Sequence, residues 1–293
     1  MTKTKTEKLT IPCAYQGGKQ RIAKDIVDIF FKENEIDDET KFYDLCCGSG
    51  AVSIELISRG INPSNIVMVD KSVWGSFWQK IGNGEFSTDV FKLYIDNIPK
   101  DISQIKSFAE NMSKQPANDG LFDNMVYKFL ILQACSFGSK ALWVENNTWK
   151  NTSFRNYWLP TETSNRKSPV NPMMPMPDTL FRRVEVILEK MEGLTGYCGD
   201  VTDITTVENN SVVYIDPPYK NTTGYGFNFD VDTYVHELQS NIKLHNKKAK
   251  IYVSEGYKMS ENAHLISSKR GKGGISGERK SANEEWLSVF TYN

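Results

Sequence analysis

The sequence predicts an α/β fold built on a doubly wound sheet, into which a mostly helical and loop-rich block is inserted. Three observations support this prediction. Short apolar runs typical of buried strands alternate with helical patterns near both ends of the 293-residue chain. The first of these runs passes through a glycine turn into a helical pattern, as in a βαβ unit. Between residues 73 and 192 the alternation gives way to short helical patterns and to a segment rich in proline, asparagine and aromatic residues.

The composition is that of a globular protein without a strong overall charge. Apolar residues make up 39% of the chain and charged residues 24%, and the formal net charge is −1. Any affinity for nucleic acid therefore has to come from a local concentration of positive charge. No apolar run approaches the roughly 20 residues of a membrane span, and the first eight residues lack the apolar core of a signal peptide. We expect a cytoplasmic protein without a membrane partner.

The cysteines and histidines suggest neither a disulfide framework nor a metal site. The five cysteines are odd in number, and Cys46 and Cys47 are adjacent, so we expect reduced thiols. The three histidines, His236, His245 and His264, have no metal-ligand spacing. We therefore expect no bound metal and no histidine-based triad.

The first candidate site is a loop that reads Tyr-Gln-Gly-Gly-Lys at residues 15–19. Two adjacent glycines allow positive φ angles and a close approach to the backbone. Lys19 begins a predicted helix that runs to about Asn34. Tyr15 and Lys19 at a helix start can hold an anionic or carboxylate-bearing ligand. A plain helix-initiating turn with a solvated lysine has the same pattern.

The second candidate site is a glycine turn between a strand predicted at residues 42–46, which contains Asp44, and a helix predicted at residues 51–59. Gly48 and Gly50 would let a cofactor approach the backbone. No third glycine follows at the dinucleotide-binding spacing, and no Gly-Lys-Ser/Thr of a phosphate loop is present. A nucleoside cofactor without phosphates fits this pattern better, although a tight strand–helix turn is an alternative.

Two further acids come at predicted strand ends. Asp70 ends the strand that begins at Asn65, at the distance of about 20 residues from the glycine turn at which a ribose-binding acid is expected. The alternative role of Asp70 is to cap the following helix. Asp200 ends a short strand at residues 196–200, where it can reach an adenine ring or cap the next turn.

The third candidate site is Asp216-Pro217-Pro218-Tyr219, which follows a strand predicted at residues 211–215. The two prolines end the strand in a rigid turn and leave nearby carbonyl groups without a local N–H donor. A carboxylate and a carbonyl can accept the two hydrogens of an exocyclic amine, and Tyr219 can stack on a flat ring. An ordinary strand-ending turn is the alternative.

The remaining elements follow from apolar periodicity and capping residues. Helices are predicted at residues 74–81, 88–98, 102–112, 121–136, 178–191 and 231–244, and strands at residues 250–254 and 285–292. The segment from 137 to 176 is predicted to be rich in loops.

Two regions carry candidate DNA contacts. Residues 137–176 interleave aromatic residues with amides and with the cations Lys140, Arg155 and Arg166, a mixture that suits base edges, phosphates and stacked bases. Residues 243–280 contain ten basic and three acidic residues, among them Lys269, Arg270 and Lys272 in a glycine-rich loop. A lid without a nucleic-acid role and a solvated charged face are the alternative interpretations.

The three motifs at residues 15–19, 44–50 and 216–219 stand in an order that resembles the Dam-like (D12, class alpha) adenine-specific DNA methyltransferases, over nearly the whole chain. The resemblance implies a Rossmann-like methyltransferase sheet formed by residues 1–72 and 193–293, with a target-recognition insertion at residues 73–192. It also implies S-adenosyl-L-methionine as the cofactor and double-stranded DNA as the partner.

The resemblance also implies roles for individual residues. Tyr15 and Lys19 would contact the methionine part of the cofactor, Asp70 the ribose, and Asp216 both the cofactor's amino acid portion and the target amine. Cys46 replaces a usual phenylalanine, and Tyr15 a common tryptophan. The recognition segment does not match a GATC-specific member, so no target sequence is transferred.

The expected reaction is methyl transfer to the N6 amine of an adenine flipped out of the duplex. Asp216 and the Pro217 carbonyl would accept the amine's hydrogens, and Tyr219 would stack on the base. A cytosine-N4 DNA methyltransferase is an alternative, although those enzymes more often have serine in place of Asp216. An RNA or protein amine methyltransferase and a non-catalytic DNA-binding relic are further alternatives.

Overall fold

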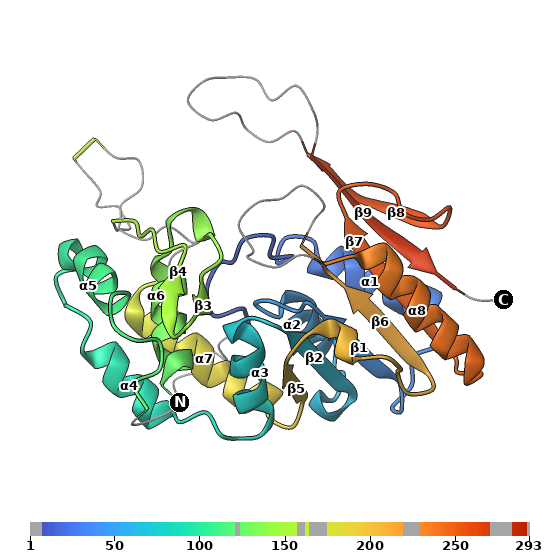
Figure 1. Ribbon diagram of the computed structural model, residues 1–293, viewed down its shortest axis with the longest axis horizontal. Coiled ribbons are helices and arrows are strands. Elements are labelled where there is room, and N and C mark those ends of the chain that lie inside the picture. The colour runs from blue at the N-terminus through green and yellow to red at the C-terminus, as the bar shows by residue number, and fades with distance from the viewer. Residues whose placement is uncertain are drawn as a thin grey trace, which may run out of the picture.

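The computed structural model describes residues 8–120, 124–156, 162–163, 175–218, 229–269 and 283–291. Its centre is a seven-stranded sheet with the strand order β5-β2-β1-β6-β7-β9-β8 (Figure 1). The strands are β1 (Lys41–Leu45), β2 (Ile66–Asp70), β5 (Thr195–Cys198), β6 (Ser211–Ile215), β7 (Ala249–Glu255), β8 (Ala263–Lys269) and β9 (Asn283–Phe290). The five strands from β5 to β7 are parallel, and β9 runs antiparallel to both β7 and β8.

Apolar side chains cover both faces of this sheet, because alternate residues of each strand point to opposite sides. On one face, Phe42 and Met68 belong to a cluster with residues of α1 (Ala23–Glu33), α2 (Ala51–Ser58) and α3 (Val73–Gly82). On the other face, β-strand residues such as Leu45 and Val69 pack with α8 (Val231–Leu244). The prediction of an α/β fold with a mostly parallel sheet is confirmed.

The strand order reverses at β1, which lies between β2 and β6. In open α/β sheets, ligands bind outside the carboxyl ends of the strands at such a reversal. β1 leads into the glycine turn, β2 ends at Asp70, and β6 leads into Asp216. The fold therefore brings three candidate sites of the sequence to one edge of the sheet.

The block between β2 and β5 contains α3 and a group of helices beside the sheet (Figure 1). These are α4 (Thr88–Asp96), α5 (Ile105–Met112), α6 (Met125–Cys135) and α7 (Pro177–Met191), with the short 3-10 helices η2 (Ile102–Gln104) and η3 (Phe137–Ser139). Helix α6 contacts α3, α4 and α5, and its residues belong to the same apolar cluster as one face of the sheet. The described part of the block thus shares a core with the sheet.

Helix α3 lies against β2 and β5 with unusually close backbones. A Cβ atom built on Gly75 would come within 2.0 Å of the Asp70 carbonyl oxygen, and one on Gly196 within 2.3 Å of the Gln79 nitrogen. Glycine at both positions permits this approach. Its tight packing makes α3 part of the layer that covers the sheet.

Most predicted elements are present, and their ends shift by a few residues. β6 and α8 begin and end where they were predicted, whereas the helix predicted from Lys19 begins at Ala23. Residues 137–156 were predicted as loop, but they include the hairpin β3 (Trp143–Glu145) and β4 (Thr148–Lys150). The sequence feature that indicates this hairpin is Asn146-Asn147. The φ angles of these two residues, 50° and 58°, are those of a two-residue hairpin turn. Strand β8 was likewise not predicted.

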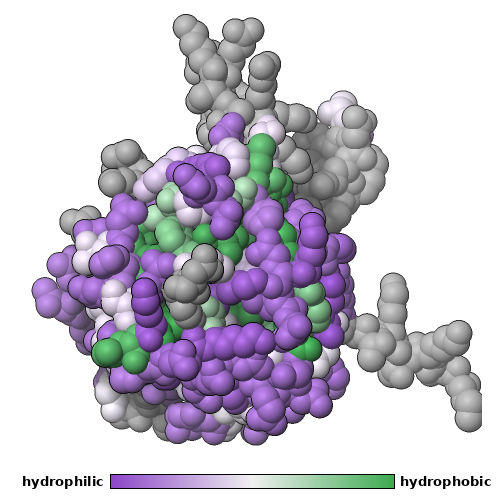
Figure 2. All heavy atoms as spheres, turned by 90° about the vertical axis from the view of Figure 1, so that its right-hand side faces the viewer, coloured by the Kyte–Doolittle hydropathy of each residue, from purple (hydrophilic) through white to green (hydrophobic). Residues whose placement is uncertain are grey.

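The remaining 3-10 helices are η1 (Pro63–Asn65) and η4 (Val201–Asp203). The face of the molecule seen in Figure 2, the right-hand side of Figure 1, is largely hydrophilic, with apolar side chains in separate patches. No helix in the described part of the chain combines the length and the apolarity that crossing a membrane requires.

Candidate active site

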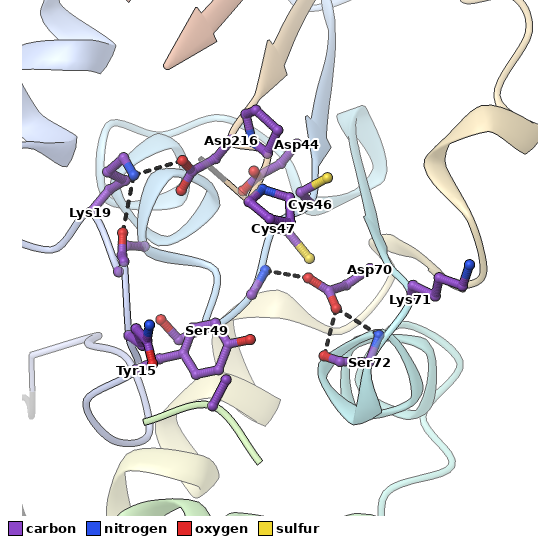
Figure 3. A pocket seen from close by; sticks show the side chains of 18 of the residues that line it. Tyr15, Lys19, Asp44, Cys46, Cys47, Ser49, Asp70, Lys71, Ser72 and Asp216 are labelled. Carbon is purple, nitrogen blue, oxygen red and sulfur yellow. Dashed lines mark hydrogen bonds and ion pairs between the residues drawn. The ribbon is translucent and has the colours of Figure 1, made fainter. Parts of the chain in front are cut away.

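A pocket of about 270 Å³ opens at the carboxyl ends of β1, β2 and β6 (Figure 3). The predicted site residues that line it are Tyr15, Lys19, Asp44, Gly48, Asp70, Asp200, Asp216 and Pro217. They come from segments that are far apart in the sequence, so their meeting is a result of the fold. Gly50 is buried and does not line the pocket, and Tyr219 lies outside the described residues.

The glycine turn depends on backbone conformations that favour glycine. Cys46, Gly48 and Gly50 have φ angles of 61°, 50° and 74°. A Cβ atom on Gly50 would come within 2.4 Å of the Trp78 ring, and the Trp78 indole N–H donates a 2.8 Å hydrogen bond to the Gly48 carbonyl. Trp78 of α3 therefore stabilises the conformation of the glycine turn.

Asp70 connects this turn to α3. Its Oδ2 accepts a hydrogen bond from the Gly48 N–H at 2.8 Å, and its Oδ1 accepts from the Ser72 N–H at 2.8 Å and from the Ser72 hydroxyl at 2.6 Å. Burial raises the pKa of Asp70. A carboxylate offers about four lone-pair sites, so these three contacts leave capacity for a ligand hydroxyl. The N-cap of α3 is Ser72 itself, whose hydroxyl accepts from the Trp74 N–H.

Asp44 is a second buried acid of the pocket. The hydroxyl and the N–H of Ser53 donate to its Oδ2 at 2.6 Å and 3.3 Å, which ties β1 to the first turns of α2. Burial raises the pKa of Asp44 to about 6. The side chain thus contributes negative charge to the pocket wall near neutral pH.

Asp200 lies at the rim, paired with a residue that the sequence prediction did not include. The Lys71 ammonium is 2.7 Å from Asp200 Oδ2, and this contact holds the pKa of Asp200 below its ordinary value. Asp200 Oδ1 also accepts from the N–H and the hydroxyl of Thr202, so it caps η4 as the alternative prediction stated. Both charged residues of this pair line the pocket.

Lys19 and Asp216, which both line the pocket, point toward each other (Figure 3). The Lys19 Nζ lies 2.6 Å from Asp216 Oδ1 and donates to the Gly17 carbonyl at 3.0 Å. Only 7% of the Lys19 side chain and 18% of the Asp216 side chain are exposed. The alternative of a solvated Lys19 is therefore wrong.

The position and the ionisation of Asp216 are both set by its surroundings. Its N–H donates to the Leu45 carbonyl at 3.0 Å, which continues the parallel pairing of β1 and β6 by one residue. Burial raises the pKa of Asp216 to about 7, although the nearby Lys19 acts in the opposite direction. The carboxyl group can therefore exchange a proton near neutral pH.

Several other lining residues were not among the predicted site residues. Tyr214 precedes Asp216 by two positions in β6, and its hydroxyl lies 2.9 Å from the Ser254 hydroxyl oxygen. The alternation of a strand would have identified Tyr214, because residues two apart face the same side. Trp143 reaches the pocket from the hairpin in the middle of the chain, and no local pattern in the sequence indicates this contact. Glu285, in β9, does not line the pocket but lies 3.6 Å from Lys19, which does.

The structure describes two of the predicted DNA contacts. Exposed Lys140 and half-buried Arg155 both contact the turn around η3. The Lys140 N–H donates to the Phe137 carbonyl, while the Arg155 guanidinium donates to the Ser136 carbonyl and lies 6.0 Å from the centre of the Phe137 ring. Arg166, Arg270, Lys272 and the side chain of Lys269 lie outside the described part of the structure. Their roles remain predictions.

Within the described ranges, no group of three or more His, Cys, Asp or Glu side chains is arranged to hold a metal ion. A comparison with individual curated proteins gave no match. A comparison with protein families gave a match to the family described as D12 class N6 adenine-specific DNA methyltransferase, over residues 15–272. This span begins at Tyr15 and contains both the glycine turn and the Asp216 turn.

Proposed function

Since the chain belongs to the D12 class N6 adenine-specific DNA methyltransferases, and so methylates adenine in DNA, we propose that the pocket at the strand ends binds both S-adenosyl-L-methionine and the target base. The observation that carries this proposal is the convergence of Lys19, Gly48, Asp70 and Asp216 in one pocket at the strand-order reversal.

The charges of the pocket fit this cofactor better than a nucleotide phosphate. Its charged lining residues in the described chain are the acids Asp44, Asp70, Asp200 and Asp216 and the lysines Lys19 and Lys71. An excess of carboxylates in a largely buried site attracts a cation such as a sulfonium and repels a phosphate. This balance agrees with the absence of a phosphate-loop sequence.

The order of the groups along the pocket supports one orientation of the cofactor. Lys19 and Asp44, which lie near Asp216, and Tyr15, whose ring lies against Gly48, would hold the methionine part. Asp70 would accept a hydrogen bond from a ribose hydroxyl with its remaining lone pair. Asp200 would accept a hydrogen bond from the adenine amine of the cofactor. Bound there, S-adenosyl-L-methionine supplies an electrophilic methyl group.

The target amine requires help because its lone pair is delocalised into the adenine ring. Asp216 and the Pro217 carbonyl would accept its two hydrogens, which draws the nitrogen toward tetrahedral geometry and directs its lone pair outward. The backbone bond from Asp216 to Leu45 and the Lys19 ammonium keep the carboxylate in place. Such fixed positioning lowers the barrier without any covalent intermediate on the enzyme.

The raised pKa of Asp216 suits it to take up the proton that the methylated amine gives up. A proton acceptor works best when its pKa lies near the working pH, and burial raises that of Asp216 to about 7. In this step an N–H bond of the amine breaks and an O–H bond forms on the carboxyl group.

The adenine has to leave the duplex before it can reach the pocket, which costs a few kcal/mol. Tyr219 would stack on the flipped base. The turn around η3, with Lys140 and the Arg155 that contacts it, would face the phosphates, and the adjoining segment with Trp143 already lines the pocket. The middle block would in this way join DNA binding to the methyl-transfer site.

The test is to replace Asp216 by alanine and to measure methyl transfer to DNA as N6-methyladenine by nucleoside mass spectrometry. We expect kcat to fall by at least about 100-fold, while the chain stays folded and still binds S-adenosyl-L-methionine. Asp232→Ala, on the first turn of α8 and outside the pocket, is the matched control. Near-normal turnover by a folded Asp216→Ala variant would refute the proposal.

A further inference from the structure

A third carboxylate approaches the contact between Lys19 and Asp216. Glu285 Oε1 lies 3.6 Å from the Lys19 Nζ, and only 16% of the Glu285 side chain is exposed. The Lys19 ammonium also contacts Asp216 and the Gly17 carbonyl. The ammonium donates hydrogen bonds at the two shorter distances, while its contact with Glu285 at 3.6 Å is an ion pair. The loop before α1, the end of β6 and strand β9 therefore meet at one nitrogen atom.

The position of Glu285 is fixed by strand pairing on both sides. In β8, Ser267 is the register partner of Glu285, and in β7, Glu255 is the partner of the next residue, Trp286. Alternation places Glu285 on the same face as Leu287, which is fully buried in the cluster that α1 covers. Glu284 points to the opposite face, where it is exposed and accepts from the Trp286 indole N–H.

Charged and titratable groups face Asp216 from several segments. Lys19 comes from the loop before α1, Asp44 from β1, Cys46 from the turn after β1, Tyr214 from β6 and Glu285 from β9. Lys19 lowers the pKa of Asp216, whereas Glu285 and Asp44 raise it. One ammonium is thus divided between at least two carboxylates. A pair formed by Lys19 and Asp216 alone would hold the Asp216 oxygen more tightly and would compete with the target amine for it.

We propose that Glu285 is a positioning residue of methyl transfer, which shares the Lys19 ammonium with Asp216 and so leaves the Asp216 carboxylate available to the amine of the target adenine. This inference rests on the role proposed for Asp216. Glu285 acts through Lys19, so it need not touch DNA or cofactor. Its effect is to weaken the hold of Lys19 on Asp216 and to keep the proton affinity of Asp216 high.

The experiment measures kcat against pH for the wild type and for Glu285→Gln. Removal of the negative charge lowers the pKa of Asp216. Since Asp216 has to be ionised to accept the amine's hydrogens, the acid limb of the profile should move to lower pH by about 0.5 to 1 unit. On the plateau, kcat should fall by about three- to tenfold, because Lys19 then pairs with Asp216 alone. The KM for DNA should change by less than about twofold.

Three further variants separate charge from structure. Glu284→Gln removes the same charge from the neighbouring residue on the opposite face and should leave both kcat and the acid limb unchanged. Glu285→Asp keeps the charge, so its acid limb should stay near that of the wild type even if kcat falls. Glu285→Ala is a second uncharged variant and should repeat the shift if Glu285→Gln does not fold.

An acid limb that stays in place in both uncharged variants overturns the inference. The same assay includes Asp216→Ala, which distinguishes this failure from failure of the proposed function. If Asp216→Ala is inactive and the uncharged Glu285 variants behave as the wild type, only the role of Glu285 is refuted. If Asp216→Ala turns over normally, the role of Asp216 is refuted, and the inference about Glu285 falls with it.

Discussion

The Gly48 N–H donates to Asp70 Oδ2 over 2.8 Å, so the glycine turn after β1 and the acid at the end of β2 form one structural unit.

Asp70→Ala would leave this N–H and the Ser72 groups without their acceptor in a buried site. We expect the free energy of unfolding to fall by about 1–3 kcal/mol in urea titrations. Calorimetry should show roughly tenfold weaker binding of S-adenosyl-L-methionine, a loss of about 1.4 kcal/mol. Asp70→Asn keeps one acceptor oxygen and should lose less stability. An unchanged stability of Asp70→Ala would show that the contact is not formed in solution.

The buried carboxyl groups Asp44 and Asp216 predict how stability depends on pH. Burial raises their pKa values to about 6 and about 7, from an ordinary value of 3.8. A carboxyl group whose pKa is higher in the folded state takes up protons on folding. Its contribution to stability is therefore full below about pH 4 and is lost as the pH rises through its folded pKa.

This dependence can be measured as a difference between two proteins. Asp216→Asn cannot titrate at this position, so the stability of the wild type relative to this variant should fall between about pH 4 and pH 7. Urea titrations at a series of pH values give the difference directly. A difference that rises with pH would mean that the Lys19 ammonium outweighs the effect of burial.

The close contact of Gly50 with Trp78 predicts a large cost for any side chain at this position. In Gly50→Ala the new Cβ would lie 2.4 Å from the tryptophan ring and at a φ of 74°. We expect a loss of stability of about 3 kcal/mol, from strain and overpacking together. Gly60→Ala is the matched control, because its φ is 93° but no atom lies within 4 Å of the new Cβ. Its cost should be only about 1 kcal/mol, and equal losses in the two variants would contradict the steric argument.

The buried side chain of Gln133 predicts a connection between the middle block and the pocket. Its amide donates to the Lys140 carbonyl at 3.0 Å and accepts from the Leu142 N–H at 3.2 Å, which holds the segment that lines the pocket. Gln133→Leu should cost about 1–3 kcal/mol in stability. Because the pocket-lining segment at residues 141–143 then loses its hydrogen bond to Gln133, the KM for DNA should rise severalfold. Gln79→Leu, on the exposed side of α3, should change neither quantity by much, and equal effects would refute the connection.

Much of the site could be predicted from the sequence because its residues stand at strand ends. The carboxyl ends of neighbouring parallel strands lie at one edge of a sheet, so Gly48, Asp70 and Asp216 had to be near one another once their strands were identified. The helices were likewise indicated by local apolar periodicity. Predictions of this kind need only the order of short segments along the chain.

The residues that escaped prediction depend on long-range geometry. Glu285 reaches Lys19 only because β9 inserts between β7 and β8, and nothing near Glu285 in the sequence specifies that register. Trp143 reaches the pocket through the packing of α6 and the hairpin that follows it. The hairpin itself could have been predicted from Asn146-Asn147, a pair of residues that favours a two-residue turn, but the prediction of a loop did not use this pattern.

The contact between Lys19 and Glu285 also has a consequence for the making of the protein. It joins the loop before α1 to β9, the last described strand. Almost the whole chain therefore has to be synthesised before Glu285, the acidic partner of Lys19, is present. Strands β1 and β2 and the glycine turn are synthesised long before β9. The complete arrangement of charges around Asp216 therefore arises only after residue 285 has emerged, and a chain released before that point lacks it.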